Sequence, residues 1–431
     1  MSALAKLMIL KGYSVSGSDI RYSAELEELG EWGAEIHLGS EPEAVKSADL
    51  VVFSGAIPAT DPELLQAIAS DKKRIRRDFL LREVSSDFDR VVAVAGTHGK
   101  TTVTAMLSSI FKEAGELYTA HIGGETFDAG NLSYRGDSCF ITEACEYRRS
   151  FLALNPDIAV ITEVEPDHPD TYRDERELFE AFEAFSSLVK EGGTVIINAD
   201  AKFYRMRQTA YKKVFTYALE SNADLRAVDM RILENGCYGF RIRQSGKPNS
   251  DITLSVPGRH NVYNALAAAA AARCYGIPDK YVSSGLKRFM GVHGRFEYLK
   301  PFRGAKLYAD YAHHPTEIKA AIRTALGLRP KRLVVVFQPH TLSRTEMLMK
   351  EFTYSFCDAD AVFFFKEYAA RESRGGKTAL ELYEKVAALG GECYYYSDMM
   401  KLACALADYL KPGDLALLTG AGDVKKVSEL L

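Results

Sequence analysis

The feature that most constrains this chain is the apolar run VVAVA at 91–95, which leads directly into the segment GTHGKTT at 96–102. A buried strand followed by a glycine loop and a helix lets backbone N–H groups and the helix N-terminus surround phosphate groups. Lys100 can neutralise phosphate charge, and the Thr101 hydroxyl can bind Mg²⁺. We therefore predict that the phosphates of ATP are bound by Gly96, Thr97, His98, Gly99, Lys100, Thr101 and Thr102.

The match is to a shortened form of the general phosphate loop, because that pattern has a glycine where this chain has Val94. The alternative is a tight strand-to-helix turn with an exposed lysine. The order of strand, loop and helix favours the phosphate loop over that alternative.

Apolar runs alternate with helical stretches along the whole chain, which predicts an α/β fold with parallel sheets and helices on both faces. A chain of 431 residues exceeds the size of a single hydrophobic core. We expect three domains at residues 1–87, 88–298 and 299–431. Strands are expected at 50–53, 91–95, 140–142, 158–162, 194–198, 306–310, 333–337, 361–365 and 415–418.

The first residues predict an amphipathic helix ending at Gly12, then a strand at 13–17 that leads into Ser18 and Asp19. This is the second half of a nucleotide-type β-α-β unit. Its first strand and glycine-rich turn would lie before Met1, so we expect the first domain to be incomplete at its start. The basic segment at 72–77 is interpreted as a solvated helix face or a linker.

Composition excludes several classes of protein. The chain has 54 basic and 58 acidic residues, so no overall positive field favours nucleic acid. Its seven cysteines form no C-x-x-C pair, which favours reduced thiols in the cytoplasm. The longest apolar stretch, at 265–272, is far shorter than the ~20 residues of a membrane-spanning helix. No pattern indicates an oligomeric state.

Polar side chains at two further strand ends are candidates for the same site. Glu143 follows a short strand, where a carboxylate can bind Mg²⁺, although such a glutamate is more often a surface residue. His168 lies in the acidic segment 163–170, which predicts either a metal or phosphate site or a plain acidic loop. Seven histidines border predicted elements and favour a site built from several loops: His98, His168, His260, His293, His313, His314 and His340.

Together, these segments resemble the Mur ligase family of peptidoglycan synthesis. Short motifs spread over nearly the whole chain carry the resemblance. They are GTHGKTT (96–102), EACEYRRSF (143–151), DH (167–168), GRHNVYNA (258–265), RFE (295–297), DYAHHPTE (310–317), FQPH (337–340), SRT (343–345) and GAGD (420–423).

The resemblance implies a Rossmann-like UDP-binding domain, truncated here, then a central P-loop ATPase domain and a C-terminal Rossmann-like domain that closes over the site. It also implies that γ-phosphoryl transfer from ATP activates the muramoyl carboxylate of UDP-N-acetylmuramate. The segment 143–151 is most like that of members whose acceptor amine is L-alanine.

The resemblance also implies residue roles. Mg²⁺ would be held by Thr101, Glu143 and His168, and adenine would be contacted by His260, Asn261 and Asn264. Asp310 would face the nucleotide, and Tyr311, His314 and Arg344 would position the amino acid or the reacting carboxyl group. Ser18 and Asp19 are assigned to the UDP substrate. The expected catalytic residues are Lys100, His168, His314 and Arg344.

The chain departs from the family pattern at several positions. Glu163 stands where asparagine is usual, and further departures are Pro169, Gly294, Ala309 and Thr341. Two alternatives therefore stay open. One is a ligase that attaches a preformed peptide to UDP-N-acetylmuramate, and the other is a degenerate nucleotide-binding relative without activity.

Overall fold

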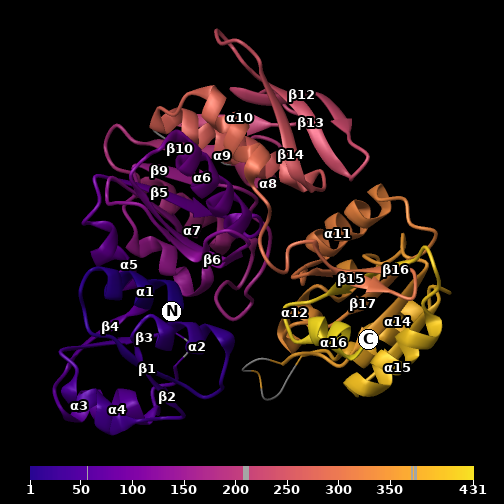
Figure 1. The fold of residues 1–431 in the computed structure, drawn as a ribbon, viewed down its shortest axis with the longest axis horizontal. Coiled ribbons are helices and arrows are strands. Elements are labelled where there is room, and N and C mark those ends of the chain that lie inside the picture. The colour runs from indigo at the N-terminus through magenta and orange to yellow at the C-terminus, as the bar shows by residue number, and fades with distance from the viewer. Residues whose placement is uncertain (56, 207–212, 370–371, 373–375) are drawn as a thin grey trace.

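The chain folds into three successive α/β units, seen in Figure 1 as the indigo, magenta and orange-to-yellow parts of the ribbon. This computed structural model describes residues 1–55, 57–206, 213–369, 372 and 376–431. The predicted three-domain α/β architecture is confirmed.

The N-terminal unit contains two separate two-stranded parallel sheets, β1 with β2 and β3 with β4. The basic segment, interpreted above as a helix face or linker, instead forms β4, because its backbone pairs with that of β3. The elements are α1 (Ser2–Leu10), β1 (Ser16–Asp19), α2 (Ala24–Glu31), β2 (Glu35–Leu38), α3 (Pro42–Ser47), β3 (Leu50–Phe53), α4 (Pro62–Ala69), β4 (Lys73–Arg76) and α5 (Arg77–Ser85).

The central unit is built on a ten-stranded sheet with the order β14-β13-β12-β11-β10-β9-β5-β8-β6-β7. The strands from β11 to β6 in this order are parallel. They are β5 (Arg90–Ala95), β6 (Tyr118–Thr126), β8 (Cys139–Glu143), β9 (Ile158–Ile161), β10 (Thr194–Asn198) and β11 (Val214–Ala218). The others are β7 (Gly130–Tyr134), β12 (Leu225–Ile232), β13 (Cys237–Gln244) and β14 (Ser250–Pro257).

Helices cover both faces of the parallel part of this sheet. Alternate residues of β5 enter two different cores, with Val92 and Val94 in one and Val91 and Ala93 in the other. This alternation explains why the strand reads as an uninterrupted apolar run. The helical elements are α6 (Lys100–Ala114), η1 (Tyr147–Ala153), α7 (Glu175–Ser187), α8 (Lys202–Met206), α9 (His260–Tyr275) and α10 (Asp279–Arg288).

The C-terminal unit contains a six-stranded sheet with the order β15-β16-β20-β17-β18-β19, parallel except for the edge strand β15. Its strands are β15 (Glu297–Phe302), β16 (Ala305–Asp310), β17 (Leu333–Phe337), β18 (Ala361–Phe365), β19 (Cys393–Tyr396) and β20 (Leu415–Thr419). Its helices are α11 (Pro315–Gly327), α12 (Leu342–Met347), α13 (Met349–Thr353), α14 (Ala379–Ala387), α15 (Met399–Tyr409), η2 (Val424–Lys426) and α16 (Val427–Leu430).

The helix that follows the phosphate loop is clamped between two others. Residues 265–272 of α9 are all buried, and α6 packs against both α9 and α10. A Cβ added at Gly285 of α10 would lie 2.5 Å from the Ile110 Cα of α6, so glycine permits this close approach. Within the described residues, no helix has the length and apolar character needed to cross a bilayer.

This contact predicts that Gly285→Ala destabilises the fold. The added methyl meets backbone that cannot move aside cheaply, and overpacking of this kind costs about 1–3 kcal/mol. Gly327→Ala, at a helical glycine with open space around it, is the matched control. Urea unfolding followed by circular dichroism should give a lower midpoint for Gly285→Ala only. Equal midpoints for the two variants would contradict the close approach.

Candidate active site

The phosphate loop connects β5 to α6 and is pressed against the end of β9. Gly96 has φ 135°, and a Cβ there would lie 2.0 Å from the Thr162 Oγ1. The Thr97 N–H donates to the Glu163 carbonyl at 2.6 Å. Gly99 has φ 82°, and a Cβ there would lie 2.5 Å from the Asn264 Oδ1. Both loop glycines are therefore required by backbone conformation and by close neighbours.

Lys100 folds back over its own loop. Its ammonium donates to the carbonyl oxygens of Gly96 and Thr97 and, at 3.0 Å, to Glu146 Oε1. Burial alone would lower the pKa of Lys100, but the attraction of the Glu146 carboxylate outweighs it and raises the pKa above its usual value. Lys100 is therefore a fixed positive charge at the N-terminus of α6, and helix N-termini are a common kind of phosphate-binding site.

The predicted metal residues come from three elements that end at one edge of the sheet. Thr101 lies in the first turn of α6, Glu143 ends β8, and His168 lies in the loop after β9. Glu143 Oε1 accepts the Gly123 N–H at 2.5 Å, whereas His168 Nε2 lies 3.6 Å from Glu146 Oε1. These are oxygen and imidazole groups of the kind that bind divalent cations.

Glu146 is a site residue that sequence reasoning did not single out. Its side chain is buried and contacts both Lys100 and His168. The available signal was a second glutamate three residues after Glu143 in the segment EACE.

A buried ion pair brings the C-terminal unit onto the central one. Arg344 of α12 donates from Nε to Asp167 Oδ1 at 2.7 Å, and the two residues are 4% and 7% exposed. Burial would raise the pKa of Asp167, but the positive charges of His168 and Arg344 hold it well below its usual range. Arg344 also donates to His340 Nδ1 at 3.0 Å. The ion pair therefore docks α12 against the loop that carries His168.

A second cluster crosses the same boundary. His98 lies between Glu165 and Glu317, and its ring is 4.7 Å from that of His314. Ligand atoms of His98, Glu165 and His314 lie within 4.8 Å of one another, close enough for a metal ion. However, His314 Nδ1 accepts the Thr316 N–H, and the Nε2 of His314 donates to the Pro166 carbonyl. With these ring nitrogens already engaged, the arrangement is an ion-pair cluster rather than an open metal site.

The residues assigned to adenine lie beside the loop at the start of α9. Asn261 Nδ2 donates to the Pro257 carbonyl at 2.7 Å, and Asn264 Nδ2 donates to Asn261 Oδ1 at 3.0 Å. Burial lowers the pKa of His260 to about 4, so this imidazole is neutral at pH 7. Neutral polar groups next to Gly99 suit the recognition of a base.

Two C-terminal residues from the DYAHHPTE segment differ in their surroundings. Asp310 accepts the N–H groups of Phe296 and Ala312, and burial raises its pKa to about 6. Tyr311 is 44% exposed, and its ring centroid lies 5.0 Å from the Arg295 guanidinium carbon.

The structure does not bring Ser18 and Asp19 to the phosphate loop. Ser18 Oγ donates to Glu63 Oε2 at 2.7 Å, and Asp19 Oδ1 accepts the Arg21 N–H at 3.2 Å. In Figure 1, α1 and α5 lie between β1 and the central sheet. These hydrogen bonds of both side chains stay within the N-terminal unit.

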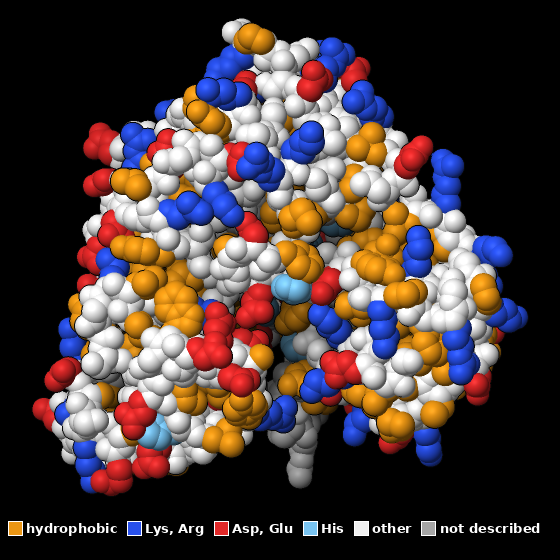
Figure 2. Space-filling view, viewed as in Figure 1, with side chains coloured by type: hydrophobic (Ala, Val, Ile, Leu, Met, Phe, Trp, Pro, Cys, Tyr) orange, Lys and Arg blue, Asp and Glu red, His pale blue; other side chains and the backbone are white. Residues whose placement is uncertain are grey.

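A recess of about 390 Å³ lies where all three units meet, and Figure 2 shows it with acidic side chains gathered over α2. Buried His121 in its wall accepts from Arg77 through Nε2, and burial lowers the pKa of His121 to about 3. Sequence reasoning missed both residues. The lining residues are Met1, Ser2, Ala3, Glu25, Arg77, residues 121–125, Asn131, His293, Gly294 and Lys425.

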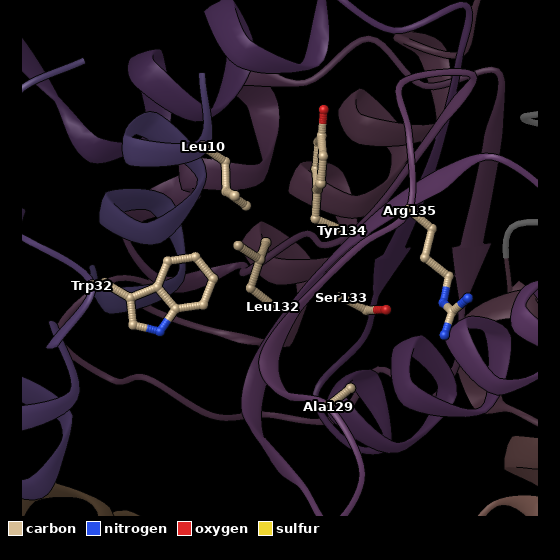
Figure 3. A pocket seen from close by; sticks show the side chains of 7 residues that line it. All are labelled: Leu10, Trp32, Ala129, Leu132, Ser133, Tyr134 and Arg135. Atoms are coloured by element: carbon tan, nitrogen blue, oxygen red, sulfur yellow. The ribbon is translucent and has the colours of Figure 1, made fainter. Parts of the chain in front are cut away.

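A second hollow, of about 510 Å³, lies between the N-terminal unit and the β6–β7 hairpin. Figure 3 shows Leu10 and Trp32 on one side of it and Leu132 and Tyr134 on the other. None of its lining residues belongs to the predicted site.

Family models match nearly the whole chain. The Mur ligase family catalytic domain matches residues 1–89, the Mur ligase middle domain matches 94–272, and the Mur ligase glutamate ligase domain matches 294–422.

Individual relatives give the same result. UDP-N-acetylmuramate–L-alanine ligases of Clostridium beijerinckii and Acetivibrio thermocellus are 38% and 39% identical to this chain. Both alignments cover 100% of it, and 94% and 92% of those proteins. The crystal structure of UDP-N-acetylmuramate-alanine ligase MurC from Thermotoga maritima is similar with a TM-score of 0.85 and 25% identity. It covers 100% of this chain and 95% of that one.

The buried pair predicts that Arg344→Gln destabilises the protein by about 3–5 kcal/mol, because Asp167 would remain buried without its guanidinium partner. Thermal and urea unfolding at pH 7 measure the loss. Arg303→Gln is the matched control, since Arg303 is exposed and donates a hydrogen bond to the Ala407 carbonyl rather than to a carboxylate. An Arg344→Gln variant as stable as the wild type would show that buried Asp167 does not need this partner.

Proposed function

Because this chain belongs to the Mur ligase family, we propose that it joins L-alanine to the muramoyl carboxylate of UDP-N-acetylmuramate at the expense of ATP. The observation that carries the proposal is the full-length similarity to proteins named UDP-N-acetylmuramate–L-alanine ligase. The family resemblance inferred from the motifs is confirmed by the same comparisons.

A carboxylate needs activation before an amine can attack it, because its leaving group would be an oxide. Transfer of the γ-phosphoryl group gives an acyl phosphate. The amine of L-alanine then attacks the carbonyl carbon, and the tetrahedral intermediate expels phosphate. Phosphoryl transfer depends mainly on alignment and charge stabilisation, which Lys100 and the N-terminus of α6 supply.

We assign Mg²⁺ to Thr101, Glu143 and His168. A hydroxyl and a carboxylate are ligands that a hard cation prefers, and an imidazole can join them, so the donor set fits. The ion would neutralise phosphate charge during transfer. The ion pair with Glu146 holds the Lys100 ammonium close to these three proposed ligands.

The remaining assignments complete the proposed site. Adenine lies against His260, Asn261 and Asn264, and Asp310 faces the nucleotide. Tyr311, His314 and Arg344 position the amino acid or the reacting carboxyl group, whereas Ser18 and Asp19 belong to the UDP substrate. Domains at 1–87, 88–298 and 299–431 are the proposed divisions, although β15 already begins at Glu297. Seven free cysteines support a cytoplasmic location.

Two other functions remain as alternatives. The fold is shared with a murein peptide ligase from Psychrobacter arcticus, at TM-score 0.75 and 23% identity, covering 100% of this chain and 95% of that one. That likeness concerns the fold alone. A degenerate ligase would keep the phosphate loop and lack turnover.

Phosphate release separates these functions. The protein would be incubated with ATP, Mg²⁺ and UDP-N-acetylmuramate, and with L-alanine, glycine, L-serine or a tripeptide in turn. Release that requires both the sugar nucleotide and L-alanine supports the proposal. Release only with the tripeptide indicates the peptide ligase, and ATP binding without release indicates the degenerate protein.

Lys100→Met should lower phosphate release by about 10²- to 10³-fold, because the developing charge loses a preorganised cation. Lys112→Met, in the last turn of the same helix and paired with exposed Asp128, is the matched control. Steady-state kinetics at saturating substrates measure both variants. Near-normal turnover of Lys100→Met would remove this lysine from the mechanism.

Glu143→Gln should raise the Mg²⁺ concentration needed for half-maximal turnover by about tenfold or more, because the site loses a negatively charged ligand. A Mg²⁺ titration at fixed ATP measures the change. Glu180→Gln replaces an exposed glutamate on α7 and should leave the titration unchanged. Coinciding curves for Glu143→Gln and the wild type would place the ion elsewhere.

A further inference from the structure

His98, in the middle of the phosphate loop, is held between carboxylates from two different domains. Its Nε2 lies 3.2 Å from Glu165 Oε2 of the central domain. Its Nδ1 lies 3.1 Å from Glu317 Oε1 in the first turn of α11, which belongs to the C-terminal domain. The loop thus contacts the C-terminal domain directly.

Both contacts can be hydrogen bonds only if the imidazole carries a proton on each nitrogen. An ionised carboxylate accepts and never donates, whereas a neutral imidazole has one donor and one acceptor nitrogen. The arrangement therefore selects the imidazolium, which makes each contact charge-assisted.

The two carboxylates are themselves held in place. Glu317 Oε2 accepts the His313 N–H at 3.0 Å, so its position follows the DYAHHPTE segment. Glu165 Oε2 accepts the Thr316 hydroxyl at 2.6 Å, which adds a second contact across the domain boundary. The carboxylates therefore form a rigid frame around the ring only while the domains are docked.

The backbone of His98 transmits this position to the loop. Its carbonyl oxygen accepts the Thr162 hydroxyl at 2.5 Å, and its neighbours in sequence are Thr97 and the left-handed Gly99. Loss of the carboxylate frame would therefore remove side-chain contacts that hold this residue, and with it the adjoining peptide groups, in place.

We propose that Glu317 is a positioning residue for nucleotide binding: by holding the His98 imidazolium against Glu165, it sets the phosphate-binding conformation of the loop when the C-terminal domain is docked. The inference rests on the proposed function, because it requires that this loop binds ATP. Under this proposal, docking of the C-terminal domain raises the affinity for nucleotide, and bound nucleotide favours docking by the same factor.

The charges around the ring give this coupling a pH dependence. Burial would lower the pKa of His98, but Glu317 and Glu165 raise it to about 10. Because the pKa is raised on docking, the stabilisation is complete below the free imidazole value and is lost as pH rises through about 10. Other charged or titratable groups facing the cluster are His314 beside the ring, Glu163 near Glu165, and Arg295 and His313 near Glu317.

The test measures nucleotide binding directly, without sugar nucleotide or amino acid. The dissociation constant of Mg²⁺–ATP would be determined by calorimetry from pH 6 to 10 for wild type, Glu317→Gln, His98→Gln and the double variant. We expect about tenfold weaker binding for Glu317→Gln at pH 8, with affinity falling at lower pH than in wild type. The double variant should be no weaker than either single variant.

Matched controls separate positioning from general destabilisation. Glu384→Gln replaces an exposed glutamate of the same domain and should bind as wild type. Glu317→Asp keeps the charge and should restore part of the affinity and of the pH profile. It also serves as the test protein should Glu317→Gln fail to fold.

Each remaining outcome counts against one idea. Additive losses in the double variant, or an unshifted pH profile in Glu317→Gln, overturn the positioning role while leaving the ligase function standing. A wild-type protein that binds no nucleotide overturns the proposed function, and this inference with it.

Discussion

The parallel pairing of β8, β5 and β9 is the constraint on which the rest of the site depends. Parallel neighbours place their carboxyl ends at one edge, so the residues after each strand share a small region of space. β5 delivers the phosphate loop, β8 delivers Glu143 and Glu146, and β9 delivers the acidic segment with His168. The three segments that follow these strands are separated in sequence, and the pairing of the strands brings them together.

Neutralisation of buried carboxylates also determines where the C-terminal domain docks on the central domain. The strand-end edge holds several buried carboxylates, which would be costly without cations. Glu146 forms an ion pair with Lys100 of its own domain. Asp167 instead forms an ion pair with Arg344 of the C-terminal domain. The buried carboxylates at this edge therefore favour docking of the C-terminal domain, because Arg344 supplies the positive charge that stabilises Asp167.

Sequence reasoning succeeded where one local pattern determined the structure. The strands β3, β10, β17 and β18 have the predicted bounds, because buried parallel strands read as uninterrupted apolar runs. The strands β12 and β13 were missed, since polar residues alternate along them as on a half-exposed surface.

The site residues were predicted from sequence motifs. The residues that were not predicted are those whose roles depend on partners distant in sequence. Glu146, Glu165 and Glu317 are ordinary glutamates in sequence, and their roles appear only once Lys100 and His98 lie beside them. Arg77 and His121 likewise meet only across a domain boundary.

The contact between Arg344 and Asp167 has a consequence for biosynthesis. Domains generally fold as units, the N-terminal ones first, as the chain leaves the ribosome. The central sheet can form long before α12 has been translated, so for that interval Asp167 has no guanidinium and His98 has only one carboxylate. A nascent chain thus carries a phosphate loop that lacks its contact with Glu317 and lies beside an uncovered acidic edge. That edge becomes covered only after the C-terminal domain has been translated and has docked.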